Sequence, residues 1–87
     1  MYEIVLTEKA AKFLERLSKS ELNKFTQKIN LVAKNPYADL PFVKRLKNSP
    51  NFRLRFGDYR GVYSVVNDIL IIKVLDIAHR KDIYMSK

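Results

Sequence analysis

Along the first half of the chain, apolar residues recur first with the period of a strand and then with that of a helix. Alternation over residues 2–6 predicts a first strand. Thr7 is placed to cap a helix over residues 8–17. A capping-box pattern at residues 18–21 starts a second helix that ends before Pro36, and the two are expected to form an antiparallel hairpin. The predicted inward residues are Ala10, Phe13, Leu14 and Leu17 on the first helix and Leu22, Phe25, Ile29 and Val32 on the second.

The second half is predicted to form a sheet. Residues 36–50 contain all three prolines and lack clear periodicity, which predicts a connecting stretch with a short turn of structure around residues 42–46. The period then becomes two, and the predicted strands cover residues 52–56, 59–66 and 69–77. Two-residue loops are expected at Gly57-Asp58 and Asn67-Asp68, which makes an antiparallel meander. This order indicates a single α+β domain over residues 1–87, with the helices packed on one face of the sheet.

Hairpin geometry places several cations on one face of this sheet. A two-residue loop at Gly57-Asp58 pairs Arg55 with Arg60 and Arg53 with Val62, and paired residues share a face. The second loop pairs Val62 with Lys73, which adds a fourth cation. The opposite face collects the apolar floor for the helices: Phe52, Leu54, Phe56, Tyr59, Tyr63, Val65, Leu70, Ile72 and Val74. The basic face suits phosphate oxygens, although a solvated face whose charges discourage aggregation explains the same pattern.

The composition predicts a class of binding partner and a cellular compartment. The chain carries 17 Lys and Arg against 9 Asp and Glu, a formal net charge of +8, and residues 44–87 hold ten of the cations. A polyanionic partner is indicated, while solubility is the plain alternative. There is no cysteine, no signal-like start and no apolar run near the ~18 residues of a membrane span. The cytoplasm is therefore the expected location, without a membrane partner.

The last residues concentrate titratable and aromatic groups. His79, the only histidine, can move protons near neutral pH, Arg80 can neutralise phosphate oxygens, and Tyr84 can stack on a base. These chemistries suit RNA cleavage. The alternative is that Ile83 and Tyr84 pack against the domain while His79 and Arg80 lie in solvent.

These residues and their order resemble the RelE/ParE superfamily of toxins from toxin–antitoxin systems, and specifically its RelE-like mRNA interferases. The resemblance covers almost the whole chain. It is carried by three segments: Phe52-Arg53-Leu54-Arg55, Gly57-Asp58-Tyr59-Arg60-Gly61-Val62-Tyr63 and Asp76-Ile77-Ala78-His79-Arg80-Lys81-Asp82-Ile83-Tyr84. It implies a ribosome-dependent endoribonuclease that cuts the mRNA codon in the ribosomal A site, beside ribosomal RNA. The implied reaction is attack of the ribose 2′-hydroxyl on the adjacent phosphate, with no metal or cofactor.

The resemblance also implies a role for each site residue. Arg53 and Arg55 match a strand pair that grips the mRNA backbone, and Arg60 matches the arginine that stabilises charge on the scissile phosphate. Arg80 matches a residue that stabilises phosphate or protonates the leaving group, and Tyr84 matches a tyrosine that stacks on or orients the reacting base. His79 matches a histidine found in only some members and is assigned as a further catalytic residue. Apart from these matches to the family, Lys73 and Lys81 are assigned to RNA binding.

One departure from the family bears on the mechanism. Some relatives have lysines at the positions of Arg53 and Arg55, and arginine, with a pKa above ~12, is no general base. Removal of the 2′ proton then falls first to His79 and next to Tyr84, with Lys81 or a ribosomal group as the other options. Arginines around the phosphate would still supply electrostatic stabilisation.

Other functions stay open at this point. The same fold serves ParE-like toxins that poison DNA gyrase without nuclease chemistry, and a basic sheet also fits a non-catalytic RNA-binding module or an inactive toxin remnant. The implied protein partner is a RelB-like antitoxin in a hetero-oligomeric complex. Such a partner, with net negative charge, is expected to occlude the arginine-bearing face or displace residues 79–84. The apolar residues expected to be exposed on that face are Val62, Ile69, Ile71 and Leu75.

Overall fold

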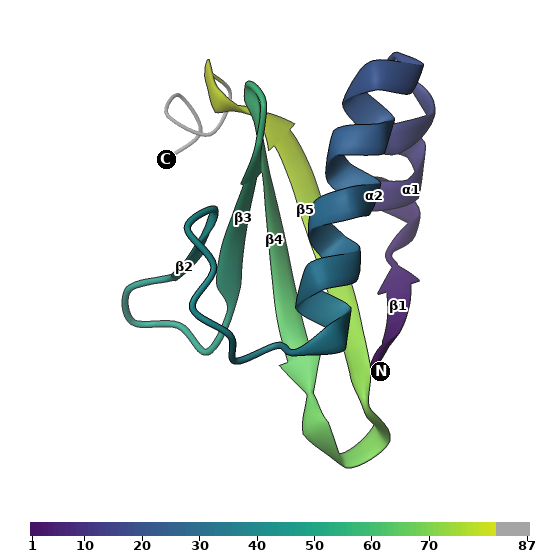
Figure 1. The fold of residues 1–87 in the computed structure, drawn as a ribbon. Coiled ribbons are helices and arrows are strands. Elements are labelled where there is room, and N and C mark those ends of the chain that lie inside the picture. The colour runs from purple at the N-terminus through teal and green to yellow at the C-terminus, as the bar shows by residue number, and fades with distance from the viewer. Residues whose placement is uncertain (82–87) are drawn as a thin grey trace.

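The structure, a computed structural model, describes residues 1–81, which fold as one mixed sheet with two helices across one face (Figure 1). In chain order the elements are β1 (Glu3–Leu6), α1 (Glu8–Glu15), α2 (Lys19–Lys34), β2 (Val43–Arg45), β3 (Phe52–Phe56), β4 (Tyr59–Val66), the 3-10 turn η1 (Asn67–Ile69) and β5 (Ile71–His79). The strand order is β1-β5-β4-β3-β2. β1 runs parallel to β5, and the other neighbours are antiparallel. The predicted α+β class and the helical layer are confirmed.

Both helices begin where the capping residues predict. The Thr7 hydroxyl accepts a hydrogen bond from the Ala10 N–H at 3.2 Å. The Ser18 hydroxyl accepts one from the Glu21 N–H, and the Glu21 carboxylate accepts one from the Ser18 N–H, both at 3.2 Å. α1 ends at Glu15, earlier than expected, and α2 ends at Lys34. Residues 1–81 contain no helix that is both long and apolar enough to cross a membrane.

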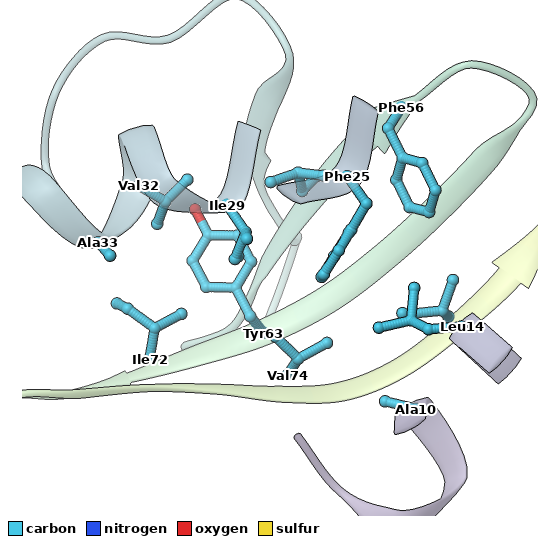
Figure 2. Close-up of a cluster of buried hydrophobic side chains, with 12 residues drawn as sticks. Ala10, Leu14, Phe25, Ile29, Val32, Ala33, Phe56, Tyr63, Ile72 and Val74 are labelled. Carbon is cyan, nitrogen blue, oxygen red and sulfur yellow. The ribbon is translucent and has the colours of Figure 1, made fainter. Parts of the chain in front are cut away.

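The core lies between the helices and the sheet, as Figure 2 shows. Its buried residues are Ala10, Leu14, Phe25, Ile29, Val32, Ala33, Leu54, Phe56, Tyr63, Ile72, Val74 and Ile77. Two residues predicted to face inward do not: Leu22 is 36% exposed and Leu70 is 54% exposed. Leu70 ends the η1 turn with a left-handed backbone, at φ 54°, which removes it from the strand alternation.

The predicted two-residue loop at Asn67-Asp68 is wrong. Residues 67–70 form the connection, because η1 inserts a helical turn and pairing resumes with Val66 opposite Ile71. The β4–β5 register then shifts between Val62 and Tyr63, so that Val62 pairs with Asp76 while Tyr63 pairs with Val74. This leaves Leu75 as the extra residue of a β-bulge. Strand β5 therefore covers residues 71–79 rather than 69–77.

The stretch expected to connect the helices to the meander contains a strand. β2 pairs with β3, with Val43 opposite Leu54 and Lys44 opposite Arg53. The meander is thereby extended on one side by β2 and on the other by β1, which pairs with β5. Lys44 of β2 joins the sheet face that carries Arg53, while Arg45 pairs with Phe52 on the opposite face.

The hydroxyl of Tyr63 gives a first prediction. Tyr63 is only 1% exposed, its hydroxyl has no hydrogen-bond partner within residues 1–81, and burial raises its pKa to about 12. Because an unpaired buried hydroxyl is costly, Tyr63→Phe is expected to raise the free energy of unfolding by about 1 kcal/mol in urea titrations. Tyr2→Phe is the control, since the Tyr2 hydroxyl donates to Asn67 Oδ1 at 2.9 Å. A Tyr63→Phe protein less stable than wild type would contradict this.

Candidate nucleic-acid interface

Four cations from three strands line one small pocket on the sheet face opposite the helices. Arg55 pairs with Arg60 across β3 and β4, as predicted, and Lys44 pairs with Arg53 across β2 and β3. Their neighbours Leu54 and Phe56 point into the core, so alternation turns the cations outward. The pocket, of about 60 Å³, is called the arginine pocket here and is lined by Pro41, Phe42, Lys44, Arg53, Arg55 and Arg60.

The arginine pocket has positive charge without a matching carboxylate. Within residues 1–81, its lining contains no acidic side chain, and no ion pair involves any of its four cations. Among the described residues, the one hydrogen bond formed by a pocket guanidinium runs from Arg60 to the neighbouring Tyr59 carbonyl, at 3.3 Å. Converging cations repel one another, and an anion in the pocket would relieve that repulsion. The arrangement therefore suits an anionic ligand.

The size of the pocket limits what it holds. Its volume of about 60 Å³ is far below the ~300–1,000 Å³ of pockets that hold whole small molecules. A single phosphate group fits such a volume better than a nucleotide does. Guanidinium groups match phosphate oxygens with paired hydrogen bonds. The geometry is suited to one phosphate of a longer chain.

Arg80 lies at the β3–β4 turn and does not line the pocket. Its N–H donates to the Asp58 carbonyl at 2.8 Å, and its Nε lies 3.9 Å from Asp58 Oδ1. This turn joins the strands that carry Arg55 and Arg60, so Arg80 is tied to the end of the same hairpin. Arg80 and Lys81 are exposed. Tyr84 lies outside the described residues.

His79 lies on the helix face of the sheet, away from the arginines. It pairs with Tyr59, and the two rings meet edge to face with centroids 5.3 Å apart. Its Nδ1 accepts a hydrogen bond from the Lys81 N–H at 3.2 Å. Ala78, rather than His79, lies opposite Arg60. The structure therefore does not bring the first choice of proton acceptor together with the arginine pocket.

The bulge at Leu75 explains the position of His79. A continuous ladder from the Val66–Ile71 pair would place residue 77 opposite Arg60 and His79 on the arginine face. The extra residue shifts the register by one and turns His79 to the other side. Ile77 is buried for the same reason.

Lys73 shares the arginine face but lies away from the pocket. It pairs with Ser64, not with Val62 as predicted, because the connection between β4 and β5 is longer than two residues. Ser64 is four residues from Arg60 on β4, which is about 13 Å at ~3.3 Å per residue. Of the apolar neighbours expected on this face, Val62, Ile71 and Leu75 are half-buried, while Ile69 is exposed but lies in η1 rather than in a strand.

Sequence reasoning missed the side of the pocket that β2 provides. Pro41, Phe42 and Lys44 come from the stretch interpreted as a connection. Phe42 and Lys44 do alternate with Val43 and Arg45, but three strand residues between prolines are too few to outweigh the turn signal. Within residues 1–81, no group of three or more His, Cys, Asp or Glu side chains is placed to hold a metal ion.

Comparisons with known proteins agree with this fold. Residues 4–84 match the family model described as the ParE toxin of the type II toxin–antitoxin system parDE. A protein of Methanocaldococcus jannaschii named toxin RelE1 is 33% identical, over 98% of this chain and 97% of its own. An Escherichia coli protein named as RelE-like toxin is 28% identical over 95% and 90%. The RelE–RelB complex of Pyrococcus horikoshii contains a chain that matches with a TM-score of 0.79 and 28% identity, over 91% of this chain and 94% of that one.

Proposed function

The chain belongs to the family of ParE toxins of type II toxin–antitoxin systems, within the wider RelE/ParE superfamily, and we propose that it is a toxin that cleaves mRNA in the ribosomal A site. The observation that carries the proposal is the arginine pocket. Four cations from three strands surround a space for one phosphate, with no acidic side chain among the described residues that line it. Such a pocket supports catalysis at an RNA backbone by stabilising charge that develops on phosphorus oxygens.

The proposed reaction exchanges one phosphorus–oxygen bond for another at the scissile phosphate. The 2′-hydroxyl oxygen loses its proton and bonds to phosphorus, the bond from phosphorus to the 5′-oxygen breaks, and that oxygen takes up a proton. The products are a 2′,3′-cyclic phosphate and a 5′-hydroxyl. Arg53, Arg55 and Arg60 stabilise the extra negative charge, and none of them acts as a base. With His79 on the helix face, proton removal is assigned to Tyr84, Lys81 or a ribosomal group.

The proposed protein partner is a RelB-like antitoxin, and the proposed location is the cytoplasm, where ribosomes work. This proposal is supported by the RelE–RelB complex of Pyrococcus horikoshii, whose RelE chain resembles this one. A partner segment with net negative charge would neutralise the arginine face and block access to the pocket. A stoichiometric complex with the antitoxin is therefore expected to lose RNA cleavage. An unchanged cleavage rate in a verified complex would contradict this prediction.

A gyrase poison is the second candidate, because the matching family model carries the name of ParE. The two candidates separate in one experiment. The protein is added to a reconstituted translation system, and new mRNA ends are mapped by primer extension beside the same mRNA without ribosomes. Codon-aligned ends that need ribosomes are the expected result. Intact mRNA together with inhibited DNA supercoiling would favour the gyrase poison, and intact mRNA with simple RNA binding would favour a non-catalytic module.

A further inference from the structure

Lys28 of α2 touches two parts of the arginine pocket from outside its lining. Its Nζ donates a hydrogen bond to the backbone carbonyl of Arg55 at 3.1 Å. The same Nζ lies 5.2 Å from the centroid of the Phe42 ring, within cation–π distance. One ammonium group therefore bridges strand β3 and the segment that precedes β2. Both segments supply residues of the pocket lining.

The backbone of Arg55 is held at both of its polar groups from this side. Its N–H donates to the Phe42 carbonyl at 2.8 Å, and its carbonyl accepts from Lys28. β2 begins at Val43, opposite Leu54, so Arg55 lies just beyond the paired part of β2. At that point the Lys28 ammonium takes the place of a strand neighbour as the donor to the Arg55 carbonyl.

The position of Lys28 is unfavourable for a cation. Burial lowers its pKa below the ordinary lysine value, and repulsion from Arg55 and Lys24 lowers it further. A lysine side chain is long and flexible, and would avoid such a cost by turning into solvent. The two contacts with Arg55 and Phe42 hold it in place, and they are contacts with the pocket.

We infer that Lys28 is a positioning residue of the arginine pocket, which fixes Arg55 and Phe42 so that the Arg55 guanidinium meets an RNA phosphate. This inference rests on the proposed function, which supplies RNA as the ligand. Lys28 acts through its neighbours and is not placed to contact the reacting atoms. Loss of its ammonium should therefore matter only while Arg55 is present.

A double-mutant cycle tests this dependence. Binding of a single-stranded RNA oligonucleotide is measured by fluorescence anisotropy, at one fixed salt concentration, for wild type, Lys28→Met, Arg55→Ala and the double variant. Lys28→Met keeps the apolar stem, and is expected to weaken binding about tenfold in the wild-type background and less than about twofold in Arg55→Ala. Lys28→Arg should restore most of the affinity. Lys24→Met removes the same charge one turn earlier on α2, and should weaken binding by less than about threefold.

Equal losses from Lys28→Met in both backgrounds would overturn the inference, as would a loss from Lys24→Met as large as that from Lys28→Met. Thermal unfolding of each variant shows that the fold is retained. A second measurement does not need RNA: amide hydrogen exchange at Arg55, followed by NMR, should be faster in Lys28→Met and unchanged in Lys24→Met. If wild type fails to cleave mRNA on ribosomes, the proposed function fails, while unchanged exchange at Arg55 would overturn the role of Lys28 separately.

Discussion

Replacing Arg60 by alanine is expected to lower the rate of mRNA cleavage by at least about a hundredfold, as removal of one charge-stabilising donor does in other enzymes. Arg60 lines the arginine pocket opposite Arg55, and its side chain makes no ion pair within residues 1–81. The fold should be nearly unaffected, because Arg60 points away from the core and its loss relieves repulsion among like charges. Single-turnover primer extension measures the rate, and thermal unfolding measures the stability.

Arg16→Ala is the matched control for this variant. Arg16 lies exposed at the end of α1, so its replacement changes the net charge equally without touching the pocket. Cleavage by Arg16→Ala should stay within about threefold of wild type, since distant surface charges act weakly through salt solution. A folded Arg60→Ala protein that cleaves as fast as wild type would remove the central residue of the proposed site.

Replacing Phe56 by alanine is expected to lower the free energy of unfolding by about 3–5 kcal/mol. Phe56 is 0% exposed, and its ring packs against Phe25 of α2 and Tyr59 of β4, with centroids 5.1 and 5.5 Å apart. The truncation leaves a cavity between α2 and the sheet, at the end of β3 that also carries Arg55. Urea unfolding followed by circular dichroism measures the change.

Tyr37→Ala serves as the comparison for the core truncation. Tyr37 is 61% exposed and donates one surface hydrogen bond to Asn67, so its loss should cost no more than about 1 kcal/mol. The two variants remove aromatic rings of similar size from opposite environments. Equal destabilisation by both would show that the packing at Phe56 does not hold α2 to the sheet as described.

The hairpin that carries the arginines is the part of the site that sequence reasoning predicts well. Its loop is two residues long, and Gly57 supplies the left-handed backbone, at φ 58°, that such a turn requires. With that loop length fixed, Arg55 must lie opposite Arg60 and Arg53 opposite Val62, as observed. A two-residue loop with a glycine in the left-handed conformation fixes the strand register, and the register decides on which face of the sheet each side chain lies.

The rest of the site depends on irregularities of the sheet that the alternation of apolar and polar residues does not predict. A bulge at Leu75 and the η1 turn each shift the register, and neither has a glycine or proline to mark it. The bulge puts His79 on the helix face, and the η1 turn places Lys73 opposite Ser64. Lys44 lies in β2, a strand of three residues. Its pairing with β3 is a tertiary contact, which the local sequence does not predict.

A single 2′-deoxynucleotide in the mRNA gives the most direct test of the central claim, that the protein promotes attack by the ribose 2′-hydroxyl. The substitution is placed at the nucleotide on the 5′ side of a mapped cleavage point, in an mRNA held on ribosomes. Primer extension should then show cleavage lost at that bond and retained at unmodified codons, because the nucleophile is missing at one position. Undiminished cleavage at the deoxynucleotide would contradict the account and point to attack by water.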